Sequence, residues 1–220
     1  MRRDCFTQRE EKMNGPTFED GLVVGNTFDK YRSRNPIARW LMGGFLSSFD
    51  DMVAASSPSS VFEVGCGEGE LAFRCARTGI PTRGTDISAR MIELAKERAR
   101  DSDLDVEFSV ADLFQIRELS PPADLIVCCE VLEHVPAPEE ALARLRALDG
   151  SHYLMSVPRE PLWRVLNVAR GRYLADLGNT PGHLQHWSRR EFLELVETEF
   201  EIQAVRAPIP WTMVLATPRG

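Results

Sequence analysis

VFEVGCGEGE, residues 61–70, joins a short apolar run to three closely spaced glycines and then to a segment with helical periodicity. The apolar run predicts a buried strand. Gly65, Gly67 and Gly69 allow the backbone to turn sharply and to bring main-chain N–H groups against a ligand at the start of a helix. The spacing is Gly-x-Gly-x-Gly and residue 70 is glutamate, so the dinucleotide pattern Gly-x-Gly-x-x-Gly is not met. A Gly-Lys-Ser/Thr sequence is also missing, which excludes a nucleoside-triphosphate loop.

On both sides of this loop, β-rich runs alternate with amphipathic segments. Such alternation implies crossover connections and a doubly wound, mostly parallel α/β sheet covered by helices on both faces. A later helix opens at Ser188, a good N-cap, and two strands joined by Ala-Pro-Ile-Pro follow it, which suggests an antiparallel hairpin at the end of the sheet. Strands are predicted at 61–64, 82–86, 106–113, 123–129, 151–158, 201–207 and 211–217, and helices at 68–78, 88–101 and 137–148.

Two regions stand outside the alternation. Residues 1–57 are predicted to form an N-terminal helical cap, whose main helix starts at Pro36 and presents an apolar face to the domain formed by residues 58–220. Residues 159–187 contain Pro, Gly, two Trp and two His, and they interrupt the regular pattern. We interpret this stretch as an inserted lid whose aromatic and basic side chains suit a small aromatic or anionic molecule.

Charge and cysteine content restrict the classes of partner. The 220 residues include 26 basic and 33 acidic side chains, a net charge of −7, which disfavours nucleic acid. The sequence has no apolar run of transmembrane length and no signal-peptide pattern in residues 1–14, so we expect a cytoplasmic protein. The five cysteines form no Cys-x-x-Cys pair and are predicted to be reduced core thiols. The adjacent Cys128 and Cys129 leave a redox or nucleophilic role as an alternative.

Two acidic residues follow the glycine loop at the ends of the next two strands. Asp86 lies 21 residues after Gly65, where a carboxylate can accept both hydroxyls of a ribose. Asp112 is placed to accept from an adenine amino group. Either residue could instead be a helix cap, but together with the loop they outline a nucleoside site along the carboxyl ends of the strands.

These motifs resemble those of the class I S-adenosylmethionine-dependent methyltransferases. The matching segments are Glu-Val-Gly-Cys-Gly-Glu-Gly at 63–69, Gly-Thr-Asp-Ile-Ser at 84–88, Ala-Asp-Leu at 111–113 and Cys-Cys-Glu-Val-Leu-Glu-His-Val at 128–135. The resemblance implies a Rossmann-like, seven-stranded sheet of order 3-2-1-4-5-7-6 with the seventh strand antiparallel. That topology agrees with the hairpin inferred above.

The resemblance also implies which residues hold S-adenosylmethionine. The glycines would approach the methionine part, Glu63 the amino group, Asp86 the ribose, and Asp112 with Leu113 the adenine. Tyr31 resembles an N-terminal residue that closes over the cofactor, although an ordinary packing role is the alternative. The complete predicted set is Tyr31, Glu63, Gly65, Cys66, Gly67, Gly69, Asp86, Ile87, Ala111, Asp112, Leu113 and Cys129.

The fourth motif carries the candidate catalytic residues. Glu130, Glu133 and His134 are spaced i, i+3 and i+4, so a helical turn after the fourth predicted strand would place them on one face. His134 is a candidate base for an acceptor hydroxyl, because imidazole titrates near neutral pH. His183 and His186 complete the predicted set, because three of the four histidines fall in two short segments.

Carboxylates and imidazoles in this pattern also suit a divalent ion such as Mg²⁺ or Mn²⁺. Glu130, Glu133, His134 and His186 would hold it, and the ion would lower the pKa of the acceptor hydroxyl. The pattern resembles two groups in which such residues hold an ion, the ubiquinone-pathway O-methyltransferases and the small-RNA 3′-terminal ribose methyltransferases. The alternatives are a His134 base with the later histidines lining the acceptor site, and a mostly structural role.

The predicted function is methyl transfer from S-adenosylmethionine to a small molecule, at a hydroxyl oxygen, with a nitrogen or carbon acceptor as the alternative. Two other functions compete with it: 2′-O-methylation of a terminal RNA ribose, and cofactor binding without catalysis as a partner protein. The polar residues of the fourth motif favour an enzyme, because a protein that only binds the cofactor does not require them.

Overall fold

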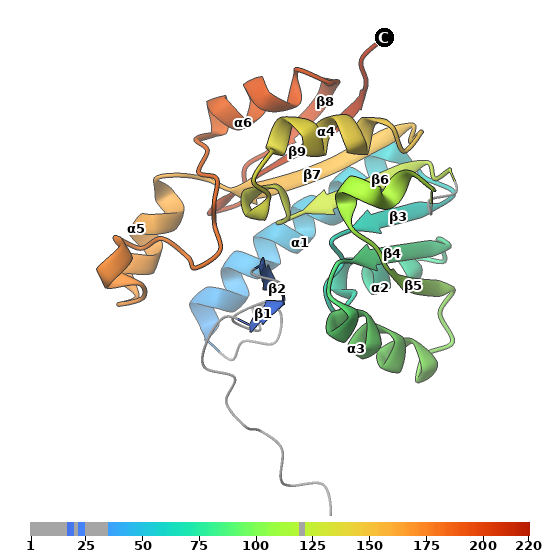
Figure 1. Cartoon of the computed structure of the whole chain (residues 1–220), viewed down its shortest axis with the longest axis horizontal. Helices are drawn as coiled ribbons and strands as arrows, with labels where there is room; N and C mark the ends of the chain where they lie inside the picture. The colour runs from blue at the N-terminus through green and yellow to red at the C-terminus, as the bar shows by residue number, and fades with distance from the viewer. Residues whose placement is uncertain (1–16, 20–21, 25–34, 119–121) are drawn as a thin grey trace, which may run out of the picture.

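The structure is a computed structural model that describes residues 17–19, 22–24, 35–118 and 122–220 (Figure 1). Tyr31, one of the predicted cofactor residues, lies outside the described residues. The first elements are two short antiparallel strands, β1 (Thr17–Glu19) and β2 (Leu22–Val24). All later strands belong to one seven-stranded sheet.

The order of this sheet confirms the predicted topology. Numbered along the chain within the sheet, the strands run 3-2-1-4-5-7-6, and only the seventh runs opposite to the other six. The glycine loop follows the first strand of this numbering, which has neighbouring strands on both sides, so other strand tips flank the loop. In spatial order the strands are β5 (Val106–Val110), β4 (Thr82–Asp86), β3 (Val61–Val64), β6 (Leu125–Cys129), β7 (His152–Pro158), β9 (Trp211–Pro218) and β8 (Phe200–Arg206).

Helices cover both faces of the sheet (Figure 1). The strand LIVCC shows how: Leu125, Val127 and Cys129 face one layer, and Ile126 and Cys128 face the other. The first layer is α1 (Pro36–Ser56), α2 (Glu70–Ala76) and α3 (Ala89–Arg100), and the second is α4 (Pro138–Arg146), α6 (Arg189–Val196) and the 3₁₀ turn η1 (Leu113–Glu118).

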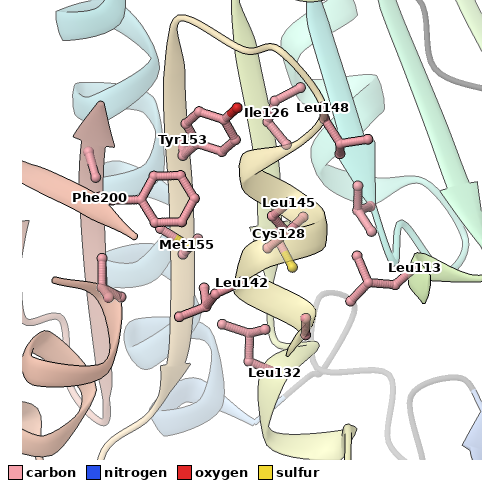
Figure 2. Packing of buried hydrophobic residues seen from close by; sticks show 14 of the residues in the cluster. Leu113, Ile126, Cys128, Leu132, Leu142, Leu145, Leu148, Tyr153, Met155 and Phe200 are labelled. Carbon is pink, nitrogen blue, oxygen red and sulfur yellow. The ribbon is translucent and has the colours of Figure 1, made fainter. Parts of the chain in front are cut away.

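The larger core lies under α4 and α6 (Figure 2). Tyr153 of β7 packs on Phe200 of β8 with ring centroids 4.6 Å apart, and Leu142 and Leu145 of α4 lie over the strands, fully buried. Burying one leucine side chain contributes about 1.5–3 kcal/mol. This packing holds β6 and β7, whose carboxyl ends carry the fourth motif, in fixed register.

Three predicted helices are shorter in the structure, because local backbone geometry sets their ends. The helix predicted at 68–78 begins at Glu70, since Gly69 before it adopts φ +79°. The helix predicted at 88–101 is α3, capped by the Ser88 hydroxyl, which accepts from the Met91 N–H. The helix predicted at 137–148 is α4, which begins at Pro138. Ser188 caps α6 as predicted, in a reciprocal capping box with Glu191.

Residues 159–187 lie between β7 and α6 and contain α5 (Leu162–Ala169) and the short 3₁₀ turn η3 (Leu174–Asp176). Figure 1 shows α5 at the end of the sheet rather than over either face. Within the described ranges, no helix has the length and apolar character needed to span a bilayer.

Candidate functional site

The glycine loop leaves β3 in a conformation that side chains rarely adopt. Gly65, Gly67 and Gly69 have φ values of +74°, +53° and +79°. A Cβ at residue 65 would lie 2.3 Å from the Val131 side chain, so glycine is also required for the close approach of β3 to the fourth motif. Around Gly67, in contrast, a Cβ would meet nothing within 4 Å. The loop is thus packed against the protein at one end and open in the middle.

Asp86 ties this loop to the tip of β4. Its carboxylate accepts from the Gly67 N–H at 2.8 Å through Oδ2 and from the Ser88 N–H at 2.9 Å through Oδ1. A carboxylate can accept from several donors at once, from hydroxyl groups as well as from main-chain N–H groups. The predicted ribose residue therefore also shapes the loop on which the cofactor would lie.

Glu63 lies beneath the loop with 3% of its surface exposed. Burial raises its pKa from 4.5 to about 8, with smaller contributions from the charges of Asp86 and Glu70. Its Oε2 is buried and makes no hydrogen bond in the structure. An unsatisfied buried carboxyl oxygen is costly, and it suits a cationic donor such as an amino group.

The predicted adenine residues lie at the tips of β4 and β5. The Asp112 Oδ1 accepts from the Phe114 N–H at 2.9 Å, the cap role that the sequence left open. Leu113 and Ala111 are buried, whereas Ile87 is 44% exposed. An exposed isoleucine beside two buried apolar residues is a surface that a flat ring could cover.

The four cysteines that the structure describes lie in the core, and Cys5 lies outside the described residues. Cys66, Cys75, Cys128 and Cys129 are all buried and free. Burial raises the pKa of the Cys66, Cys128 and Cys129 thiols well above the ordinary value, and that of Cys75 to about 12. Neighbouring Cys128 and Cys129 face opposite helix layers. Protonated, buried thiols agree with the core interpretation and give no support to the nucleophilic alternative.

Glu130 differs from the prediction. It does not share a helical turn with Glu133 and His134, because it has φ +61° and ends β6 before the turn begins. Its carboxylate accepts from the Trp211 Nε1–H at 2.6 Å and from the Ser156 hydroxyl at 3.3 Å. The turn itself is the 3₁₀ helix η2 (Leu132–His134), whose i, i+3 geometry excludes the single α-helical face that we expected.

Three other predicted residues do converge. Glu133 and His183 are buried and His134 is half-buried. One potential ligand atom from each lies within 4.8 Å of those of the other two. The His134 and His183 rings meet edge to face, with centroids 5.0 Å apart and planes at 83°. We call Glu133, His134 and His183 the acid–imidazole group.

Main-chain hydrogen bonds join residues 182–185 to the η2 turn. The Glu133 carbonyl accepts from the N–H groups of Leu184 at 2.8 Å and Gln185 at 3.0 Å. The His134 Nδ1 lies 2.8 Å from the Gly182 carbonyl oxygen. A carbonyl oxygen only accepts, so Nδ1 carries the proton, and the lone pair of the neutral ring lies on Nε2.

His186 lies apart from this group. It is exposed, and its Nε2 is paired with the Asn179 side chain at 2.7 Å. The four predicted metal ligands, Glu130, Glu133, His134 and His186, therefore do not meet. Among the residues that the structure describes, the set with ligand geometry contains His183 in place of Glu130 and His186. Neither the spacing of the fourth motif nor the His-x-x-His pattern distinguished the two later histidines.

Sequence reasoning missed two tryptophan contacts and one carbonyl. Trp211 holds Glu130, Trp163 stacks on His183, and the Gly182 carbonyl orients His134. Trp163 is recognisable from the sequence only as one aromatic residue of an irregular segment, and Trp211 only as the first residue of a strand. All three contacts join distant parts of the chain, and no local pattern marks them.

The sheet order and four motifs at its carboxyl edge define the class of this protein. It has the fold of the class I S-adenosylmethionine-dependent methyltransferases. Residues 61–148 match the family model described as a methyltransferase domain. The fold and this match together support a class I S-adenosylmethionine-dependent methyltransferase.

Comparisons with known proteins agree with this assignment. The chain is 30% identical over 149 residues to a ubiquinone biosynthesis O-methyltransferase of Xanthomonas oryzae pv. oryzae, covering 61% of this chain and 62% of that protein. It is 34% identical over 88 residues to the protein of the same name from Coxiella burnetii, covering 40% of this chain and 38% of that one. This chain thus spans less than two thirds of either curated relative.

Among solved structures, the fold is similar to magnesium protoporphyrin IX methyltransferase from Synechocystis PCC 6803, solved with bound S-adenosylhomocysteine. The TM-score is 0.65 at 21% identity, over 87% of this chain and 94% of that one. At this level of identity the similarity concerns the fold.

Proposed function

We propose that this chain binds S-adenosylmethionine over the tips of β3, β4 and β5 and transfers its methyl group to a hydroxyl oxygen of a small molecule. The observation that carries the proposal is the position of the acid–imidazole group beside the glycine loop. Gly65 comes so close to Val131 that only a hydrogen fits between them, and Glu133 and His134 lie two and three residues after Val131. Groups able to manage a proton therefore lie next to the loop that would hold the cofactor.

The residues under the loop fit the cofactor by charge and hydrogen bonding. S-adenosylmethionine supplies a methyl group on a positively charged sulfur and also carries an ammonium group. The orphaned Glu63 Oε2 suits that ammonium, and the Asp86 carboxylate can accept from ribose hydroxyls. Gly65, Cys66, Gly67 and Gly69 would lie along the methionine part, with Ile87, Ala111, Asp112, Leu113 and Cys129 as the remaining predicted contacts.

His134 acts as the general base in this proposal. Its Nδ1–H is held by the Gly182 carbonyl, so Nε2 offers the lone pair that takes the proton of the acceptor hydroxyl. Transfer to oxygen requires this proton to leave, because a neutral hydroxyl is a weak nucleophile. His183, in contact with the His134 ring, borders the acceptor. Glu130 supports the turn through Trp211 rather than contacting the acceptor.

A divalent ion is the second candidate for the same task, and the geometry of the acid–imidazole group favours it. One carboxylate and two imidazoles within 4.8 Å fit the ligand preferences of Mn²⁺, and Mg²⁺ fits less well because it prefers oxygen. Such an ion would lower the pKa of a bound acceptor hydroxyl. The two candidates exclude each other at one atom, because the Nε2 lone pair of His134 either binds the ion or accepts the proton.

The test combines cofactor binding with methyl transfer. Calorimetry with S-adenosylmethionine and S-adenosylhomocysteine measures cofactor binding. Transfer of a radiolabelled methyl group to a panel of hydroxylated aromatic acceptors then measures activity. Turnover that EDTA abolishes and Mn²⁺ restores would select the ion, and turnover that EDTA leaves unchanged would select the His134 base. Failure of both cofactors to bind would overturn the proposal.

The same assay separates the two rival functions. Transfer to a 3′-terminal RNA ribose, with an affinity that falls steeply as salt is added, would identify an RNA enzyme. Cofactor binding without transfer to any acceptor, small molecule or RNA, would identify a binding protein. The net charge of −7 favours the small molecule over RNA.

A further inference from the structure

Trp163, near the start of α5 in the 159–187 segment, lies against the acid–imidazole group. Its indole stacks on the His183 imidazole, with ring centroids 5.8 Å apart and planes at 26°. The His183 ring also meets the His134 ring edge to face. His183 is therefore packed between an aromatic ring of α5 and the ring of the candidate base.

A hydrogen-bond network fixes the indole itself. Its Nε1–H donates to the Thr180 hydroxyl at 2.9 Å, and that oxygen also accepts from the Asn167 amide at 3.2 Å. Asn167 is 1% exposed and also donates to the Gly178 carbonyl at 2.9 Å. Buried polar groups with several partners hold one arrangement, so the indole has a defined orientation.

The imidazole, in contrast, has no strong rotational preference of its own. The χ2 torsion of histidine is broad, so the plane of the ring can turn at little intrinsic cost. Contacts on the face of the ring therefore help to set its plane. The stacked indole is a large, rigid surface that can do this.

We propose that Trp163 is a positioning residue, which holds the plane of the His183 imidazole so that the edge of this ring stays directed at the His134 ring. Its effect on turnover rests on the proposed methyl transfer, whereas the ring geometry does not. Trp163 also packs edge to face on Trp211, with centroids 5.7 Å apart, and Trp211 donates to Glu130. One indole of α5 is thus linked to His134 through His183 and to Glu130 through Trp211.

Three variants test this role. Trp163→Leu removes the stacking surface, and Trp163→Phe keeps an aromatic ring but loses the Nε1 donor. Trp187→Leu is the matched control, because Trp187 belongs to the same segment and packs on Phe192 of α6 instead of on a histidine. Thermal unfolding and calorimetry with S-adenosylhomocysteine measure stability and cofactor binding in each variant.

We expect Trp163→Leu to lower kcat about tenfold to a hundredfold, as for a misplaced catalytic group, while the KM for the cofactor stays within twofold. Trp163→Phe should recover most of this loss. The Trp187→Leu variant should keep its kcat even where its unfolding temperature falls. Unchanged kcat in Trp163→Leu, or equal losses in the two Leu variants, would overturn the proposal.

A measurement without substrate separates this inference from the proposed function. The chain has four histidines, so the imidazole proton resonances can be assigned by single His→Gln variants. At one fixed pH, the His183 resonances should move downfield in Trp163→Leu, because the ring current of the indole is lost, and should stay in place in Trp187→Leu. Resonances that do not move in Trp163→Leu would overturn the positioning role. Absence of turnover in the wild type would overturn only the proposed function and, with it, the kcat part of this test.

Discussion

The two halves of the sheet edge are built in opposite ways. On the side of β3, β4 and β5, the site consists of short motifs and backbone groups, and the Gly67–Asp86 bond joins residues 19 apart. On the side of β6, β7 and β9, the His134–Gly182 bond spans 48 residues and the Trp211–Glu130 bond spans 81. The first half depends on local conformation, and the second on how the whole domain is assembled.

This difference predicts separate responses to mutation. Changes in the first half, the cofactor side, should alter affinity for S-adenosylmethionine and leave catalysis intact. Changes in the second half, the acceptor side, should lower turnover at unchanged cofactor affinity. The following four substitutions test that division from the largest expected effect to the smallest.

His134→Ala should show the largest effect. Weaker cofactor binding in this variant would contradict the division between the cofactor side and the acceptor side. Removing either a general base or an ion ligand is expected to lower kcat about 10²–10⁴-fold. His152→Ala, at the amino end of β7, is the matched control and should keep wild-type kcat. Steady-state kinetics and calorimetry measure the two quantities. Wild-type kcat in the His134 variant would remove this residue from the mechanism.

Asp86→Ala should come next, now on the cofactor side. It removes the predicted ribose acceptor and leaves the Gly67 and Ser88 N–H groups without their carboxylate partner. Charged hydrogen bonds contribute about 1.5–3 kcal/mol each, so we expect affinity for S-adenosylhomocysteine to fall at least about a hundredfold by calorimetry. Asp101→Ala, just after α3, is the control. Retained affinity would refute the ribose assignment.

Glu63→Gln sharpens the comparison through pH. Burial raises the pKa of Glu63 from 4.5 to about 8. The unfolded chain therefore releases this proton at a lower pH than the folded protein, and the free energy of unfolding falls as pH rises from 4.5 through 8. The neutral variant should remove this loss. At pH 8 we expect its free energy of unfolding in urea to exceed that of the wild type by about 1–3 kcal/mol.

The same substitution should weaken cofactor binding, because the ammonium group loses its carboxylate. Glu68→Gln, in the exposed part of the loop, should change neither stability nor affinity. Equal pH dependence of stability in wild type and Glu63→Gln would show that another group titrates.

Arg98→Ala should give the smallest effect. Arg98 donates to the Glu68 carbonyl at 2.7 Å and to Glu70 at 2.9 Å, so it braces the glycine loop from α3 without facing the ligand. Loss of this brace should weaken S-adenosylhomocysteine binding about threefold to tenfold, at unchanged kcat. Arg100→Ala is the control, since its side chain is 66% exposed. A larger fall in kcat than in affinity would contradict the division between the halves.

The fold could be predicted from the sequence because its determinants are local. Strand and helix periodicities alternate, and an antiparallel hairpin after Ser188 agrees with the strand order implied by the motifs. Helix ends were less accurate, since they depend on single backbone conformations such as that of Gly69. Asp86, the glycines and Glu63 could also be placed at the correct strand ends, because each directly follows or belongs to a strand.

The candidate acceptor site could be predicted only in part. Glu133 and His134 are adjacent to a buried strand, which locates them. The choice of His183 over His186 depends on how residues 182–185 bond to the η2 turn. The position of Glu130 depends on the Trp211 indole at the start of β9. Both are consequences of tertiary packing across long sequence separations, which periodicity and spacing do not encode.

Residues 182–185 are attached to the η2 turn mainly through main-chain groups, and this matters for diversification of the family. The Glu133 carbonyl bonds the amides of residues 184 and 185, and the Leu184 side chain is 53% exposed. A new side chain at residue 184 therefore leaves these anchors intact. Variant libraries aimed at altered acceptor preference can therefore vary residue 184, because the Gly182 carbonyl still fixes the His134 tautomer.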